Sequence, residues 1–152
     1  PVIGNKKLCG ILTELALEAE TNEVQYAVVG IGINCRQKPE DFDIAIRDVA
    51  CSLAMATEKP VDRNLLTANC IRELEVLSHN YLAEKARYMA QYRKDCVTVG
   101  KQVQVVRGEN VRRGCALNVD DDGGLLVAFE DGKTETVSAG EVSVRGMYGY
   151  AE

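Results

Sequence analysis

The stretch 28–34, Val-Val-Gly-Ile-Gly-Ile-Asn, combines β-branched residues with two glycines and a terminal amide in a spacing that suggests a ligand-binding strand. Its β-branched residues predict a buried strand, yet glycine, which weakens strands, occupies positions 30 and 32. Side chains alternate across a strand, so Gly30, Gly32 and Asn34 share one face with Val28, and we expect the opposite face to be packed. A face without side chains can bring backbone against a flat ligand, and an amide at its end can hydrogen-bond that ligand. The alternative is a glycine-weakened core strand that passes close to a neighbouring element.

The preceding segment, 6–20, fits two periodicities. Apolar residues alternate with glutamates from position 11 onward, which predicts a half-buried strand, although Leu8, Ile11, Leu12 and Leu15 also fit a helical stripe. We favour the strand, because the polar residues 20–23 form a turn that leads directly into the strand 24–35. In an antiparallel hairpin, residues equally distant from the turn face one another. We therefore expect Lys7 and Gly10 to lie near residues 32–34.

Two helices are predicted after this hairpin. A polar loop, 36–43, contains Pro39, and apolar residues then recur at helical spacing over 42–55. Asp62 is a good N-cap for a longer helix, which we expect to break near 83–86. His79, the only histidine in the chain, lies on that helix, and we interpret it as solvated or locally bonded rather than catalytic.

The composition changes after Cys96, where short β-rich segments alternate with turn residues. The five predicted strands, 103–106, 115–119, 125–129, 134–137 and 142–145, suggest a small barrel. We interpret Asp120–Asp122 as a solvated turn rather than a calcium loop. For Arg112-Arg113 we favour a solvated loop, with a phosphate or partner contact as the second interpretation. The fold class is therefore α+β, with one domain over 1–96 and a second over 97–152.

Composition limits the possible partners and sites. The chain has 152 residues and a net charge of −5, so it lacks the basic field that nucleic acid requires. Its six cysteines include no Cys-x-x-Cys pair, so we predict no metal site and reduced thiols in a cytoplasmic protein. No apolar run is long enough to span a membrane, and we expect a soluble protein. The start at Pro1, without methionine, suggests a fragment or a processed product.

Several motifs together resemble biotin protein ligases, also called biotin–[acetyl-CoA-carboxylase] ligases. They are the runs 7–12 and 30–34, the helix pattern through Leu53 and Leu74, the step Val99-Gly100-Lys101, and the run 140–145. The resemblance implies a catalytic domain with a mixed sheet flanked by helices, followed by an SH3-like barrel. It also implies ATP-dependent formation of biotinyl-5′-AMP, with Mg²⁺, and transfer of biotin to a lysine of a biotin carboxyl carrier domain.

The resemblance assigns roles to eight residues. Lys7 matches a catalytic lysine that contacts the biotin carboxylate and the adenylate phosphate, where a cation can gather negative charge. Arg145 matches an arginine that reaches over the adenylate, where a guanidinium can stack on adenine or pair with phosphate. Four residues match backbone positions around biotin, and two match positions near the ribose and phosphate: Gly10, Ile11, Gly30 and Gly32, then Ile33 and Asn34.

Two family motifs precede the matched region and are not in this sequence. These are a loop rich in glycine and arginine and a Lys-Trp-Pro-Asn-Asp stretch. We therefore expect the C-terminal part of a ligase that is inactive by itself. The helix-turn-helix of some relatives is also missing, so DNA binding is not implied. Family members often dimerise edge to edge, and an incomplete sheet would expose such an edge.

Two rival functions remain open. A lipoate-type ligase or transferase uses the same acyl-adenylate logic, although the terminal barrel with Gly-Glu-Val-Ser-Val-Arg favours biotin. A module that binds biotin or a protein without catalysis would also fit a chain that lacks half of the ligase site. Calorimetric titration with biotin and with lipoate would distinguish a biotin ligase from a lipoate-type ligase.

Overall fold

The computed structural model describes residues 1–18, 20, 21 and 23–138, and the backbone alone of 142–146. The chain has two compact units, Pro1–Thr67 and Ala68–Glu152. The first contains a long hairpin and short helical turns, and the second contains most of a long helix and an antiparallel sheet. The predicted α+β class is confirmed, and the predicted domain boundary at 96/97 stays a prediction.

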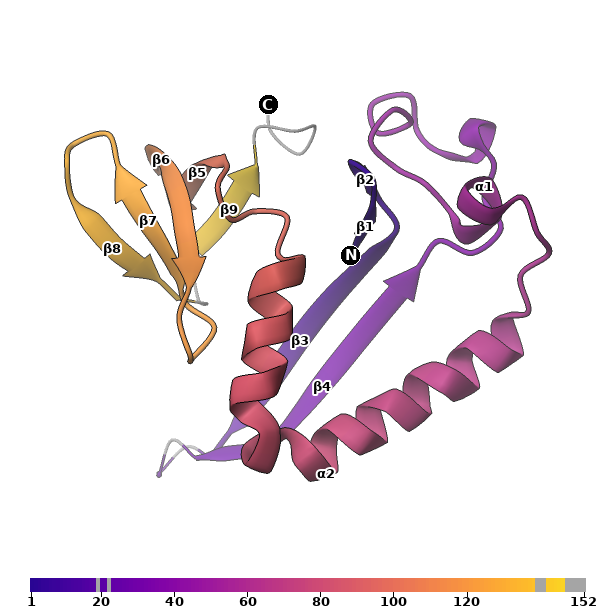
Figure 1. Ribbon diagram of the computed structural model, residues 1–152, viewed down its shortest axis with the longest axis horizontal. Helices are drawn as coiled ribbons and strands as arrows, with labels where there is room; N and C mark the ends of the chain where they lie inside the picture. Colours follow the sequence, from indigo (N-terminus) through magenta and orange to yellow (C-terminus); the bar gives the residue numbers. More distant parts are fainter. Residues whose placement is uncertain (19, 22, 139–141, 147–152) are drawn as a thin grey trace. The chain divides into compact units, whose positions relative to one another are not determined.

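The first unit is built on the predicted hairpin (Figure 1). Strand β3, Cys9–Leu17, pairs antiparallel with β4, Val24–Ile33, with Gly10 opposite Gly32 and Leu12 opposite Gly30. Two shorter strands, β1 (Val2–Ile3) and β2 (Lys6–Lys7), precede it as a second antiparallel pair. Among the described residues, the one parallel contact is a bridge between Lys7 and Ala50. The strand prediction for 6–20 and the expected register are therefore confirmed.

The two faces of this hairpin differ in chemistry. We call the side that carries Gly10, Leu12, Gly30 and Gly32 the glycine face. The opposite side, the apolar face, carries Ile11, Thr13, Leu15, Ala27, Val29 and Ile31. The large side chains of the apolar face remain between 37% and 59% exposed. The expectation that this face would be packed is therefore wrong for the described residues.

The predicted helix over 42–55 is also wrong. The segment instead contains a 3₁₀ turn, η1 (Pro39–Asp41), followed by turns and by a short helix, α1 (Leu53–Thr57). The helix cannot run through 49–51, because the backbone of Lys7 donates to the Val49 carbonyl and accepts from the Cys51 amide, at 2.7 and 2.9 Å. Phe42 and Ala50 are buried as predicted, but in non-helical backbone.

The long helix α2 spans Arg63–Asp95. Asp62 caps it, since its Oδ1 accepts from the amides of Asn64 and Leu65 at 3.0 and 3.1 Å. Glu84 has non-helical backbone angles, and the helix bends there in Figure 1, as the predicted break near 83–86 requires. His79 Nδ1 lies 2.8 Å from the Glu75 carbonyl on the exposed helix surface, so its local bonding is confirmed.

The C-terminal sheet of the second unit has five antiparallel strands in the order β8-β7-β6-β5-β9. They are β5 (Gln102–Arg107), β6 (Asn110–Val119), β7 (Leu125–Phe129), β8 (Thr134–Val137) and β9 (Val142–Gly146). Its core consists of Val103, Val105, Ala116, Val127, Phe129 and Val137. All five predicted strands are confirmed, and closure of the sheet into a barrel stays a prediction.

Arg112 lies in β6 rather than in the predicted loop. Its guanidinium lies 3.6 Å from the centroid of the Phe129 ring and forms ion pairs with Asp131 and Glu135 at 3.1 and 2.9 Å. The hydrogen bond from Arg112 lowers the pKa of Glu135. Arg113 lies beside it in the same strand. The predicted solvated loop is therefore wrong, because cross-strand partners hold Arg112 over the core.

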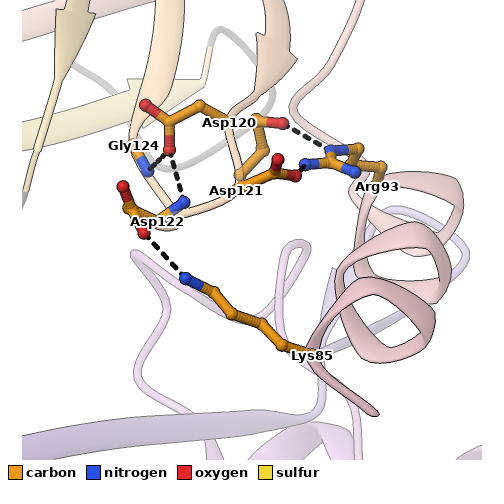
Figure 2. Close-up of polar contacts among 7 residues, drawn as sticks. Lys85, Arg93, Asp120, Asp121, Asp122 and Gly124 are labelled. Carbon is orange, nitrogen blue, oxygen red and sulfur yellow. Dashed lines mark hydrogen bonds and ion pairs between the residues drawn. The ribbon is translucent and has the colours of Figure 1, made fainter. Parts of the chain in front are cut away.

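The acidic turn 120–122 joins the sheet to the second half of α2 (Figure 2). Lys85 pairs with Asp122 at 2.7 Å, and Arg93 pairs with Asp121 while its Nε donates to the Val119 carbonyl at 2.6 Å. Asp120 Oδ1 closes the turn by accepting from the amides of Asp122 and Gly124 at 3.0 and 2.7 Å. These carboxylates therefore serve the fold, as the prediction of a turn rather than a calcium loop implies.

Candidate active site

The glycine face offers uncovered backbone. Among the described residues, a Cβ added at Gly30 would meet only the Leu12 carbonyl oxygen, at 3.6 Å. At Gly32 it would meet only the Gly10 carbonyl oxygen, at 4.0 Å. Within the described part of the first unit, no helix or loop packs against these two positions, which does not support the alternative of a close-packed core strand. The open face can instead receive a flat ligand against its main chain.

The side chain of Lys7 extends over the same face. A Cβ added at Gly10 would lie 3.7 Å from Cε and 3.9 Å from Nζ of Lys7. The ammonium group is therefore held at the Gly10 end of the glycine face, next to the cross-strand pair of Gly10 and Gly32. A cation beside exposed backbone can bind an anionic group, such as a carboxylate or a phosphate.

Asn34 directly follows β4 and forms hydrogen bonds with two other segments. Its amide donates to the Leu8 carbonyl at 3.0 Å, and its carbonyl accepts from Leu53 at 2.9 Å. Its side-chain Nδ2 donates to the Cys51 carbonyl at 3.0 Å. The half-buried Asn34 therefore ties the end of the hairpin to the segment that pairs with Lys7.

Five of the eight predicted site residues come together at one end of the hairpin: Lys7, Gly10, Gly30, Gly32 and Asn34. Ile11 and Ile33 pair with Ile31 and Cys9, on the side away from the glycine face. Only their backbone could therefore reach a ligand on the glycine face, which agrees with the predicted backbone contact of Ile11.

Arg145 lies in the other unit. Its backbone is in β9, opposite Gln104, and its side chain lies outside the part of the chain that the structure describes. The predicted contact between Arg145 and an adenylate therefore stays a prediction.

Sequence reasoning missed Ser52, which is fully buried. Its Oγ donates to the Gln37 carbonyl at 2.6 Å and accepts from the Met55 amide at 3.2 Å, so it caps α1 and holds the loop after β4. The available signal was a serine directly before the apolar run 53–56, which is a typical N-cap position. The longer helical pattern over 42–55 concealed that signal.

The structure offers little to a metal ion. No group of three or more His, Cys, Asp and Glu side chains is placed to ligate one within the described ranges. The Mg²⁺ implied by the family resemblance stays a prediction. In the same part of the chain, no helix is long and apolar enough to cross a membrane.

Comparison with known proteins gives consistent matches to one family. Residues 98–145 match the family model "Biotin protein ligase C terminal domain". The chain is 34% identical over 137 residues to biotin–[acetyl-CoA-carboxylase] ligase of Mycobacterium tuberculosis, and this alignment covers 90% of the chain and 47% of that protein. It is 30% identical over 143 residues to the bifunctional ligase/repressor BirA of Bacillus subtilis, and this alignment covers 91% of the chain and 42% of that protein. The chain therefore spans less than half the length of these curated relatives.

Solved structures of biotin protein ligase from Aquifex aeolicus have the same fold. The apo form gives a TM-score of 0.78 at 24% identity, over 95% of this chain and 61% of that one. The form in complex with biotin and ATP gives a TM-score of 0.75 at 25% identity, over 95% and 58%. The family-model match over residues 98–145 and the similarity over about nine-tenths of the chain together show that this chain is homologous to biotin protein ligases.

Proposed function

We propose that this chain carries the biotin-binding part of a cytoplasmic biotin protein ligase. The enzyme would couple biotin to ATP and transfer biotin to a lysine of a biotin carboxyl carrier domain. The observation that carries the proposal is the ammonium group of Lys7 beside the uncovered backbone of Gly10, Gly30 and Gly32. Two facts about relatives support it: a homologue was solved with biotin and ATP, and another is named a biotin–[acetyl-CoA-carboxylase] ligase.

In the first step, a carboxylate oxygen of biotin attacks the α-phosphorus of ATP. An acyl–phosphate bond forms, and pyrophosphate leaves with the electron pair of the broken phosphoanhydride bond. Negative charge is concentrated where the two reactants meet, and the Lys7 ammonium would stabilise it there. The glycine face would hold the flat ring system of biotin against main-chain groups, so that the carboxylate points toward Lys7.

In the second step, the amine of the carrier lysine attacks the acyl carbon of biotinyl-5′-AMP. An amide bond forms, AMP leaves, and the attacking nitrogen gives up a proton. The Lys7 ammonium would again stand beside the oxygen atoms that gain charge. Ile33, the last residue of β4, and Asn34, which follows it, would contact the ribose and phosphate, as their matches to the family imply. Arg145 would contact the adenylate from the C-terminal sheet, as its match to the family arginine implies.

The exposed apolar face suggests that the 152 residues alone have little ligase activity. Large apolar side chains on a two-stranded hairpin require a cover in a stable enzyme. The relatives are about twice as long as the matched region, so we propose that the rest of a ligase supplies this cover and the remaining contacts to ATP. The chain alone would then bind biotin weakly and release little pyrophosphate. A biotin-binding module without catalysis is the second candidate, since the glycine face and Lys7 could bind biotin without the remaining contacts to ATP.

Calorimetric titration of the full chain tests the proposal. We expect Lys7→Met to weaken biotin binding roughly tenfold or more, since a charge-assisted hydrogen bond is lost. The matched control, Lys6→Met, removes the neighbouring lysine and should leave binding unchanged. Equal losses in the two variants, or tighter binding of lipoate than of biotin, would contradict the proposal.

Pyrophosphate release separates the enzyme from the binding module. It should appear with biotin and ATP only when the remaining portion of a biotin protein ligase is added in trans, and Lys7→Met should abolish it. Rapid turnover by the chain alone would refute the need for a second part. Biotin binding without turnover in the complemented mixture would favour the module.

A further inference from the structure

The backbone around Lys7 is part of a closed ring of hydrogen bonds. The Cys51 amide donates to the Lys7 carbonyl at 2.9 Å, and Asn34 Nδ2 donates to the Cys51 carbonyl at 3.0 Å. The Asn34 amide in turn donates to the carbonyl of Leu8, the residue covalently joined to Lys7, at 3.0 Å. The single side-chain contact in this ring comes from Asn34.

The segment that contains Cys51, which forms one side of this ring, is well packed. Cys51 is 5% exposed, and Ser52, the next residue, is fully buried with its hydroxyl bonded to the loop after β4. The segment 49–51 cannot shift outward without breaking the Asn34 contact or the two backbone bonds to Lys7. Because the Lys7 backbone is held on both sides, its side chain leaves the chain at a fixed point and reaches Gly10.

We infer that Asn34 is a positioning residue for Lys7. Its side chain holds the segment 49–51 against the Lys7 backbone, and so fixes the ammonium group over the glycine face. The relevance to biotin rests on the proposed function, whereas the positioning of Lys7 does not. Asn34 thus acts on an anionic ligand through Lys7, besides any contact of its own backbone.

Amide hydrogen exchange tests the positioning without any ligand. In Asn34→Asp the donor is replaced by an oxygen that repels the Cys51 carbonyl, so the amides of Lys7 and Cys51 should exchange about tenfold faster. Asn34→Ala, which removes the donor without repulsion, should act at the same two amides. The matched control, Asn64→Asp at the exposed start of α2, should leave both rates unchanged, and the Val127 amide in the second unit serves as reference. Unchanged exchange at Lys7 and Cys51 in both Asn34 variants would overturn the inference.

A double-mutant cycle with biotin tests whether Asn34 acts through Lys7. Asn34→Asp should weaken binding about tenfold in the natural chain, but less than about twofold once Lys7→Met is present, because interacting residues are not additive. Equal losses in both backgrounds would overturn the inference, since Asn34 would then act independently of Lys7. If the natural chain binds no biotin, the proposed function fails in this chain, and the exchange rates still decide the positioning role.

Discussion

At the scale of single residues, the candidate site depends on the missing side chains of its glycines as much as on the side chain of Lys7. Glycine at positions 30 and 32 leaves backbone uncovered, with only one carbonyl oxygen near each missing Cβ. Neither position needs glycine for its backbone conformation, since the positive φ angles of this chain's described glycines occur elsewhere. Both glycines are therefore explained better by an approaching ligand than by the fold.

The first prediction concerns Gly30→Val. Valine favours strands, and its Cβ would meet only the Leu12 carbonyl oxygen, at an ordinary van der Waals distance, so the melting temperature should not fall. Its methyl groups would occupy the glycine face, and biotin binding should weaken about tenfold or more by calorimetry. Ala27→Val, on the opposite face of the same strand, is the matched control and should bind like the natural chain. A Gly30→Val chain that unfolds would assign this glycine to packing instead.

At the scale of elements, the sequence predicted local structure better than contacts between distant segments. The hairpin followed from alternation and from one polar turn, because its register depends on neighbouring residues. The helix over 42–55 failed since its apolar spacing was read without the bond between Val49 and Lys7, which is remote in sequence. The uncovered glycine face followed from residue type and strand alternation, whereas the role predicted for Lys7 came from the family resemblance. The link from Asn34 to Cys51 was not, because an amide can serve a ligand or a backbone carbonyl equally well.

The second prediction concerns the ion pairs of the C-terminal sheet. Arg112 lowers the pKa of Glu135, so the folded sheet binds its proton less readily than the unfolded chain does. This contribution to stability is present above the ordinary pKa of glutamate and disappears as the pH falls through the lowered pKa. Glu135→Gln should therefore reduce the melting temperature at neutral pH, and the difference should vanish in acid.

Thermal unfolding followed by circular dichroism across a pH series measures this effect. Glu130→Gln, which removes an exposed carboxylate without a described ion pair, is the control and should differ little from the natural chain at any pH. A pH-independent difference between Glu135→Gln and the natural chain would show that Glu135 stabilises the sheet through packing rather than through its charge.

At the scale of the whole molecule, the chain combines a net charge of −5 with a hairpin whose apolar face is exposed. Both β3 and β4 also have one edge without a partner strand among the described residues. Exposed apolar strands with open edges are templates for pairing with another chain. The same surface would accept the remainder of a ligase or, in its absence, a second copy.

The third prediction is that the isolated chain self-associates through this face. Val29→Lys places a charge in the middle of the apolar face and should shift the distribution toward monomer in sedimentation velocity. Leu82→Lys, at a site that is 90% exposed on α2, adds the same charge elsewhere and should leave association unchanged. If both substitutions act equally, net charge rather than the apolar face controls association.

The glycine face also limits how the specificity of this protein can be altered. Gly10, Gly30 and Gly32 already carry the smallest possible substituent, so mutation there can only take room away from a bound molecule. Engineering at these positions can therefore produce variants that accept smaller analogues, but none that accept larger ones. For the proposed biotin ligand, binding of bulkier derivatives would require smaller residues in place of large side chains on the same face, such as Leu12 opposite Gly30.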